Sequence, residues 1–200
     1  MNINVNLTDK PMVSLAGKAV WPKINTRYDE FEGKKKYKLS LEFEDKEDEA
    51  KMKKICDDLL EAAKANAKFE GKKWSADATT GYKEREDGSL LFNFQTTAFY
   101  KDRQTGEEKQ KFIPVLDTVH GCPLDKDVAI GEGSVVRVLY QPSAYWSSTR
   151  ANGVNLYIMQ LAVDKLVRYN GGGIDYDAFG VTPQAEENPF DGDSDEEIPV

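Results

Sequence analysis

The chain has 200 residues, of which 40% are hydrophobic, and it carries a formal net charge of −8. This length allows one domain with a sizeable core, while the modest apolar fraction predicts that part of the chain is not folded. The two cysteines and the single histidine form no CxxC pair or His/Cys cluster, and the sequence shows no signal peptide or membrane span. These features argue against a zinc site and a disulfide scaffold, and they predict a soluble, intracellular protein without a metal or other cofactor.

The first predicted strand lies within Val13–Ile24 and ends at Pro22. Asn25–Gly33 is expected to be a loop. The run Tyr37–Phe43 alternates apolar and polar residues, which is typical of a strand with one buried face. Seven basic residues against three acids give residues 18–38 a local charge of +4.

One amphipathic helix is expected from Asp45 to about Asn66. Asp45 is a candidate N-cap, and acids follow it in the first turn, where the helix dipole favours negative charge. Apolar residues at helical spacing predict one buried face, made of Met52, Ile55, Cys56, Leu59 and Ala63. The opposite face is charged, so the helix is expected to lie on the surface of the body.

The middle of the chain predicts a hairpin. Leu90–Tyr100 is expected to be one strand and Lys109–Leu116 its partner, with a turn at Lys101–Gly106. The segments on either side, Phe69–Gly88 and residues 117–133, are expected to be irregular.

The two longest predicted strands, Ser134–Gln141 and Val154–Val163, organise the rest of the fold. Both are rich in β-branched and aromatic residues. Apolar residues fall on both of their faces, which favours a closed barrel over an open sheet with one solvated face. The segment Pro142–Gly153 between them is expected to be a loop. It contains no acid, and it carries Tyr145, Trp146 and Arg150.

Five or six strands, one helix and no βαβ alternation predict a mainly β fold of the OB type, a small barrel with one amphipathic α-helix. We assign residues 1–169 to this domain and residues 170–200 to a flexible, disordered acidic C-terminal tail. The tail contains nine acids and no Lys or Arg, so residues 1–168 carry +1 within a chain of −8. The acidic total therefore does not argue against a nucleic-acid partner.

Several segments together resemble a phage single-stranded DNA-binding protein of the replication type found in short-tailed lytic phages. The resemblance rests on Gly131-Glu132-Gly133-Ser134, the strand with Tyr140, the Tyr145-Trp146 segment, the second long strand, and Gly171-Gly172-Gly173 before the acidic tail. It extends upstream to Gly33–Phe43, the helix and Phe92–Thr105. The resemblance implies an OB fold that binds single-stranded DNA in the cytoplasm of the infected bacterial host.

The resemblance also implies partners and contacts. The family's acidic C-terminus contacts replication proteins, here the polymerase and helicase-primase, and it often mediates dimerisation. Tyr145 falls where the family places a base-contacting tyrosine, and Lys34 falls near a basic residue implicated in DNA contact. The strand Phe92–Ala98 departs from the pattern, because Asn93, Gln95 and Thr97 stand where relatives show Lys and Tyr. The last residues, Glu196-Glu197-Ile198-Pro199-Val200, are similar to the acidic Ile-Pro-Phe ending of bacterial single-stranded DNA-binding proteins.

DNA contacts are expected from basic side chains that follow phosphates and aromatic side chains that stack on bases. The candidate DNA-binding residues are Trp21, Arg27, Tyr28, Lys34, Lys35, Lys36, Tyr145, Trp146, Arg150 and Tyr157. A structural alternative stays open for each, since the aromatic residues also suit core packing and the lysines a solvated turn. The candidate partner-binding residues are Asp193, Asp195, Glu196, Glu197, Ile198, Pro199 and Val200.

The leading hypothesis is sequence-independent binding of single-stranded DNA in phage replication, recombination and repair. The tail would recruit replication proteins and compete with DNA. The alternative is a protein-interaction adaptor or acidic DNA mimic, in which the tail is the active part. An enzyme is not expected, because the sequence shows no P-loop, G-x-S-x-G, HExxH or paired-Cys site. His120 and Cys122 lack a visible orienting acid, which argues against a Cys–His nucleophile.

Overall fold

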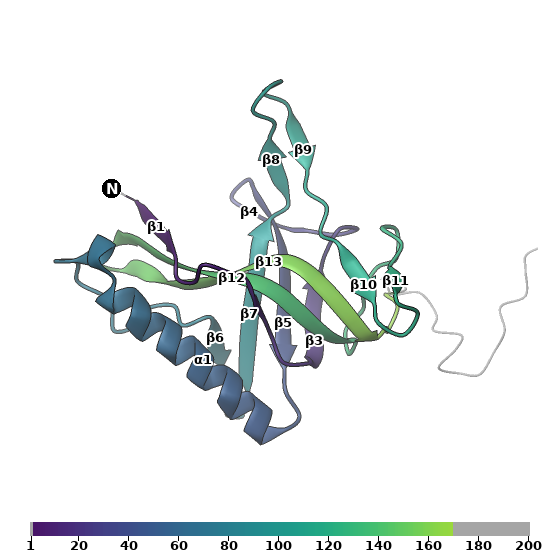
Figure 1. Cartoon of the computed structure of the whole chain (residues 1–200), viewed down its shortest axis with the longest axis horizontal. Coiled ribbons are helices and arrows are strands. Elements are labelled where there is room, and N and C mark those ends of the chain that lie inside the picture. Colours follow the sequence, from purple (N-terminus) through teal and green to yellow (C-terminus); the bar gives the residue numbers. More distant parts are fainter. Residues whose placement is uncertain (1, 170–200) are drawn as a thin grey trace, which may run out of the picture. The chain divides into compact units, whose positions relative to one another are not determined.

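Five strands close into a ring at the centre of the computed structural model, which describes residues 2–169 (Figure 1). The order around the ring is β12, β3, β5, β7 and β13, and β13 pairs again with β12. All neighbours are antiparallel except β7 and β13, which are parallel. The mainly β, OB-like barrel with one helix is thereby confirmed. The ring strands are β3 (Gly17–Lys23), β5 (Lys34–Glu42), β7 (Leu90–Thr97), β12 (Val135–Ser148) and β13 (Ala151–Lys165).

The ring closes because each strand places alternate side chains inside it. In β5 the buried positions are Tyr37, Leu39 and Leu41, and the residues between them are half-buried. At the centre of the barrel the Phe94 and Tyr140 rings meet edge to face, with centroids 5.2 Å apart. Register shifts in the β12–β13 pair provide the curvature that closure needs.

The helix α1 (Lys46–Ala65) begins and ends where the sequence predicts. The carboxylate of Asp45 accepts a hydrogen bond from the Glu47 amide at 2.7 Å, which caps the helix N-terminus. The buried face packs against β12 and β13, and it consists of Glu49, Met52, Cys56, Leu59, Leu60 and Ala63. A short 3₁₀ turn, η1 (Ala67–Phe69), follows. Among residues 2–169, no helix is long and apolar enough to cross a membrane.

Short strands add to the ring, mostly in places where a loop or no element was expected, although residues 115–116 lie within the predicted strand Lys109–Leu116. They are β1 (Ile3–Asn6) and β2 (Met12–Val13) on β12, β4 (Asp29–Phe31) on β5, β6 (Tyr82–Glu84) on β7, β10 (Val115–Asp117) on β13, and β11 (Cys122–Pro123) on β10. The expectations of an unbroken loop over Asn25–Gly33 and of irregular structure over Phe69–Gly88 and residues 117–133 are therefore wrong in part. Each added strand has two to four residues, which is too short to show a repeat in the sequence.

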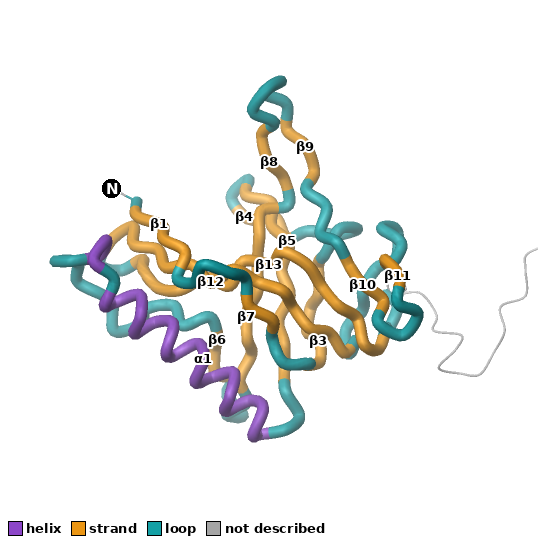
Figure 2. The backbone as a smooth tube through the Cα atoms, viewed as in Figure 1, coloured by secondary structure: helices purple, strands orange, loops and turns teal. Residues whose placement is uncertain are grey.

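A hairpin of β8 (Phe99–Lys101) and β9 (Glu108–Gln110) projects away from the ring at the top of Figures 1 and 2. The predicted hairpin is correct in its turn but wrong in its partners. Only residues 108–110 pair, and they pair with β8, whereas β7 pairs with β5, β6 and β13. Residues 115–117 instead form β10 beside β13.

The predicted loop between the two long strands is also wrong. β12 continues through Tyr145 and Trp146 to Ser148, and β13 starts at Ala151, so only Thr149 and Arg150 form the turn. β1 lies along this end of the hairpin, with Asn4 opposite Tyr145. This third strand supplies backbone partners that keep the end of the hairpin extended.

Candidate nucleic-acid interface

A row of polar side chains crosses the outside of the ring at one level. The register pairs Lys23 with Lys38, Lys38 with Gln95, Gln95 with Tyr157, and Tyr157 with Gln141. These residues are half-buried, and their sequence neighbours in the ring are mostly buried, so the row faces outward. We call these five residues the cross-strand row. It joins all five strands of the ring across one surface.

Hydrogen bonds fix the side chains of the row and its neighbours. The Gln95 amide nitrogen donates to Asn155 Oδ1 at 3.0 Å, and Lys36 Nζ donates to Gln95 Oε1 at 3.1 Å. Asn4 Nδ2 lies 3.5 Å from the Tyr157 hydroxyl. The middle of the row is therefore an ordered amide and hydroxyl surface, which can hydrogen-bond bases and sugars as well as phosphates.

Lysines gather at the β5 end of this surface. Lys34, Lys36 and Lys38 are at alternate positions of β5, so they share the outward face. Asp29 pairs with Lys38 and, at 2.8 Å, with Lys23, and these two hydrogen-bonded lysines lower the pKa of Asp29 to about 2. Within residues 2–169, no carboxylate lies within 4 Å of Lys34 or Lys36. These two ammonium groups are available to an anion.

Lys36 is held partly out of solvent. Burial is the main cause that lowers its pKa, and the nearby charges of Lys38 and Lys34 lower it further. An ammonium group that is desolvated and surrounded by like charge gains more from a phosphate than a fully solvated one does. The cluster of Lys34, Lys36 and Lys38 therefore favours binding of a polyanion.

Trp21 is presented to solvent by a bulge in β3. Its backbone φ is +48°, and the β3–β5 register shifts between Val20 and Lys23. A positive φ is unfavourable for a bulky residue, and such strain concentrates at functional sites. The indole is 61% exposed, and the Arg85 guanidinium lies 5.9 Å from its ring.

Tyr145 and Trp146 lie at the far end of β12 and point to opposite sides of it. Tyr145 pairs with Gly153 and so shares the outward face with Asn155 and Tyr157, while its hydroxyl is 2.9 Å from Thr79 Oγ1. The Trp146 indole donates to the Lys73 carbonyl at 3.0 Å, and its ring packs against the core. Both rings are half-buried.

The other tip residues add positive charge near these rings. The Lys72 ammonium lies 4.8 Å from the Trp146 ring centroid. Arg150 is exposed in the two-residue turn.

Arg27 and Tyr28 have structural partners. The Arg27 guanidinium donates to the carbonyls of Pro22 at 2.8 Å and Ile130 at 3.2 Å, and it stacks 3.4 Å from the Tyr169 ring centroid. Tyr28 meets Phe99 edge to face, with centroids 5.4 Å apart. The structure therefore separates Arg27, which contacts the protein itself, from the outward-facing lysines.

Two other expectations from the sequence concern a Cys–His nucleophile and a metal site. Asp117 Oδ2 lies 2.7 Å from His120 Nδ1, so the view that His120 lacks an orienting acid is wrong. The same carboxylate accepts from the amides of Val119 and His120, which makes the pair part of a surface turn. Within residues 2–169, no group of His, Cys, Asp or Glu is placed to hold a metal. The partner-binding candidates, 193–200, lie outside the described residues.

Sequence reasoning missed several residues of the surface, namely Lys23, Lys38, Gln95, Gln141 and Asn155. The alternation of β5 was a signal for Lys38, since it assigns Lys34, Lys36 and Lys38 to one face and Lys35 to the other. No comparable signal identifies the amides, because their position depends on pairing between distant strands.

Comparisons with known proteins agree with this fold. The family model described as "Single-stranded DNA-binding protein, Bacteriophage T7" matches residues 16–166. The chain is 30% identical over 90 residues to the single-stranded DNA-binding protein of Enterobacteria phage T3, covering 44% of this chain and 38% of that protein. It is 28% identical over 105 residues to that of Escherichia phage T7, covering 52% and 43%. The matched region thus spans less than half the length of these relatives.

Two solved structures show the same fold. The crystal structure of a single-stranded DNA-binding protein encoded by bacteriophage T7 has a TM-score of 0.60 and 23% identity, covering 90% of this chain and 97% of that one. The single-stranded DNA-binding protein of bacteriophage Enc34, solved in complex with single-stranded DNA, has a TM-score of 0.55 and 16% identity, covering 82% and 86%. Because the family model matches residues 16–166, well over half of the chain, the chain belongs to the phage T7-type family of single-stranded DNA-binding proteins.

Proposed function

We propose that this protein binds single-stranded DNA without sequence preference and acts in phage replication, recombination and repair in the host cytoplasm. The observation that carries the proposal is the outward surface of the ring, where Lys34 and Lys36 lie beside the cross-strand row and pair with no carboxylate of residues 2–169. Membership of the T7-type family supports the same conclusion. Lysines supply the sequence-independent attraction to phosphates, and exposed rings such as Trp21 and Tyr28 supply stacking.

Single strands suit this surface better than a duplex does. Aromatic rings stack on the faces of unpaired bases, and the Watson–Crick edges of the bases are open to the amides of the row only in a single strand. All ten sequence candidates are exposed or half-buried, although Arg27 and Trp146 donate hydrogen bonds to backbone carbonyls of the protein itself. We assign phosphate contacts to the lysines and Arg150, and base contacts to the rings.

We infer a second role for the acidic C-terminal segment, residues 170–200. Its nine acids are covalently linked to a body of charge +1, and tethering gives an effective concentration on the order of millimolar. The segment would compete with DNA for the lysine surface, and, when released, its end would recruit polymerase and helicase-primase. A homodimer could also form if each acidic segment occupied the lysine surface of the other subunit.

The direct test is filter binding of the full chain to a labelled oligonucleotide, with a duplex of equal length as competitor. We expect preference for the single strand and a linear fall of log affinity with log salt, by about 0.7 per phosphate neutralised. Replacing Lys34→Gln and Lys36→Gln together should reduce the slope by about 1.4, two contacts' worth.

The matched control is Lys51→Gln with Lys54→Gln, which removes the same charge from helix α1, where both lysines pair with acids. This control should leave the slope unchanged. Absence of single-strand binding by the parent protein would overturn the proposed function. Equal losses in the two double variants would show that net charge alone governs binding.

A further inference from the structure

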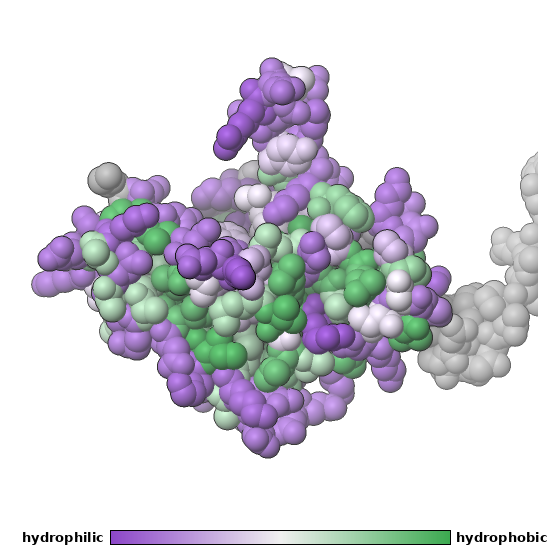
Figure 3. Space-filling view, in the orientation of Figure 1, coloured by the Kyte–Doolittle hydropathy of each residue, from purple (hydrophilic) through white to green (hydrophobic). Residues whose placement is uncertain are grey.

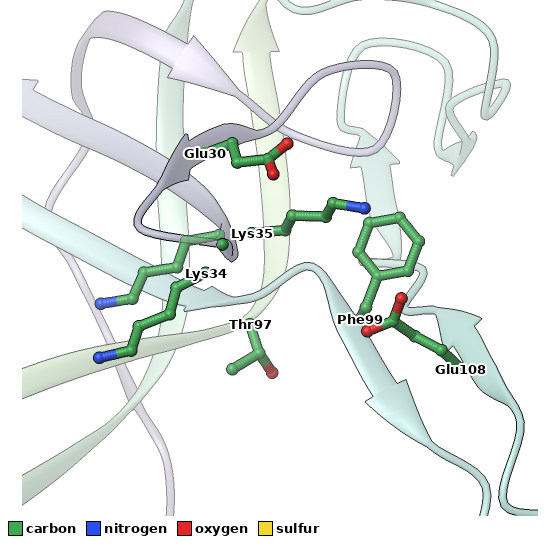
Figure 4. Close-up of a pocket in the computed structure, with 8 residues that line it drawn as sticks. Glu30, Lys34, Lys35, Thr97, Phe99 and Glu108 are labelled. Carbon is green, nitrogen blue, oxygen red and sulfur yellow. The ribbon is translucent and has the colours of Figure 1, made fainter.

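Two cavities of similar size lie side by side at the start of β5. The first is about 400 Å³ and is lined by residues of β5, β7, β8 and β9, including Thr97, Phe99 and Glu108 (Figure 4). The second is about 390 Å³ and is lined by the β4–β5 hairpin, including Phe31. We call them the Phe99 cavity and the Phe31 cavity. Small-ligand sites span about 300–1,000 Å³, so each suits one nucleotide.

Lys34 and Lys36 line both cavities and so separate them. The other residue common to both is Glu30, while Asp29 in the Phe31 cavity is already paired with Lys23 and Lys38. The two shared lysines outnumber the one shared carboxylate and attract a phosphate, whereas Glu108 and Glu32, which line one cavity each, repel it. The favourable position for a phosphate is therefore between the two cavities.

Phe31 forms an aromatic wall of its cavity. It pairs directly with Lys34 across a two-residue turn, in which Glu32 and Gly33 have φ values of +50° and +72°. Two positive φ values are the mark of a tight type I′ hairpin turn. The ring is 70% exposed, so its apolar surface is open to a ligand.

Phe99 forms the corresponding wall of the other cavity. Figure 4 shows Lys35 reaching toward the Phe99 ring and Glu108 below it. The Lys35 ammonium lies 4.8 Å from the ring centroid, and Tyr28 packs on the ring edge to face. These contacts hold Phe99 in one orientation while part of the ring still lines the cavity.

We propose that the two cavities bind two successive nucleotides of a single strand. One base stacks on Phe31, the next stacks on Phe99, and the phosphate between them lies on Lys34 and Lys36. The inference rests on the proposed function, and it adds Phe31 and Phe99, two residues outside the candidate set, as base-contacting residues. An aromatic ring on each side of a phosphate site matches the alternation of base and phosphate along a strand.

The test compares Phe31→Ala with Phe112→Ala in the full chain. Both rings are exposed, by 70% and 52%, but Phe112 lines neither cavity. Affinity is measured by fluorescence quenching, for a normal oligonucleotide and for an abasic strand of the same length. Phe31→Ala should weaken binding of the normal strand about 5- to 150-fold, from the cost of about 1–3 kcal/mol per stacked base. It should leave the abasic strand and the salt slope unchanged.

Phe99→Leu is the companion variant, because leucine keeps apolar packing at the hairpin base but offers no aromatic face. It should show the same loss on the normal strand only. The inference is overturned if the parent binds single strands and both Phe31→Ala and Phe99→Leu bind them with the affinity of the parent. It is also overturned if Phe112→Ala loses as much affinity as Phe31→Ala does. Failure of the parent to bind any single strand would instead overturn the proposed function.

Discussion

The lysines of β5 differ from one another in ways that their sequence run hides. Lys34 is exposed, Lys35 turns toward Phe99 and Tyr28, and Lys36 is partly buried and donates a hydrogen bond to Gln95. Burial is the first cause of the lowered Lys36 pKa. Of the three, Lys36 is therefore the one whose charge the protein destabilises and a phosphate would restore.

This gives a prediction for pH. Because the free protein lowers the pKa of Lys36 below 10.5, Lys36 loses its proton earlier than an unperturbed lysine as pH rises. A bound phosphate favours the protonated form, so DNA binding in that range takes up a proton and affinity falls with increasing pH. Lys36→Arg keeps its charge and should flatten the alkaline fall measured by filter binding between pH 7 and about 10. Lys34→Arg is the control and should keep the fall. Identical profiles for the parent and both variants would exclude Lys36 from the interface.

At the scale of elements, the long β12–β13 hairpin depends on one glycine. Gly153 has a φ of +147° and forms a parallel bridge with Thr79, whose backbone lies alongside it. A Cβ atom there would lie 2.4 Å from the Thr79 nitrogen and oxygen. On the same segment, Thr79 Oγ1 lies 2.9 Å from the Tyr145 hydroxyl.

We therefore expect Gly153→Ala to destabilise the protein by about 2–4 kcal/mol, from overpacking against fixed backbone and from the unfavourable φ. Gly88→Ala is the matched control, because its φ is +79° but no atom lies within 4 Å of the new Cβ. It should cost about 1–2 kcal/mol, the cost of a left-handed conformation alone. Urea unfolding followed by tryptophan fluorescence measures both. Equal costs would show that Thr79 moves aside freely.

Local signals predicted the elements that local physics determines. The Asp45 cap, the apolar stripe of α1 and the alternation of β5 are each set within a few residues, and each is confirmed. The break expected at Pro142 is wrong: proline often marks the end of a strand, but β12 continues through Pro142. The carbonyl of Pro142 accepts a hydrogen bond from the Leu7 amide at 3.0 Å.

The residues of the candidate surface also fall into two groups, those that local sequence signals reveal and those that only the topology brings together. Lys34, Lys35 and Lys36 are visible as a basic run, whereas the exposure of Trp21, which stands between Val20 and Pro22, depends on a bulge in β3 that no local pattern predicts. Gln95 and Asn155 are 60 residues apart and meet only through the parallel pairing of β7 with β13. Neither composition nor periodicity carries information on such a pairing, which is a property of topology.

At the scale of the whole molecule, polarity and charge are unevenly distributed. The hairpin β8–β9 is almost wholly hydrophilic in Figure 3, whereas an apolar area covers parts of β12, β13 and β10. Leu116 of β10 and Met159 of β13 are exposed apolar side chains. Along the chain, nine acids follow Arg168 and leave the preceding residues at +1.

From that asymmetry we predict that deleting residues 174–200 tightens DNA binding, most strongly at low salt, where screening is weakest. A full-length variant with the same acids changed to Asn and Gln separates charge from length, and it should tighten binding equally. Titrations at two ionic strengths measure both variants. If neither binds more tightly than the parent at low salt, the acidic segment does not compete with DNA, although partner recruitment would be unaffected by that result.

The order of strands around the ring also determines when this protein can fold. β1 pairs with β12, so Ile3 has no partner until Trp146 is made, while β3 can pair early with β5 but leaves its other edge open until Val135 is made. At synthesis rates of about 5–20 residues per second, β1 spends roughly 7–30 seconds on the ribosome before its partner exists. Pairing over such separations is slow, and unpaired strand edges invite association with other chains. Nascent copies made on neighbouring ribosomes would therefore be most vulnerable to mispairing just before β12 emerges.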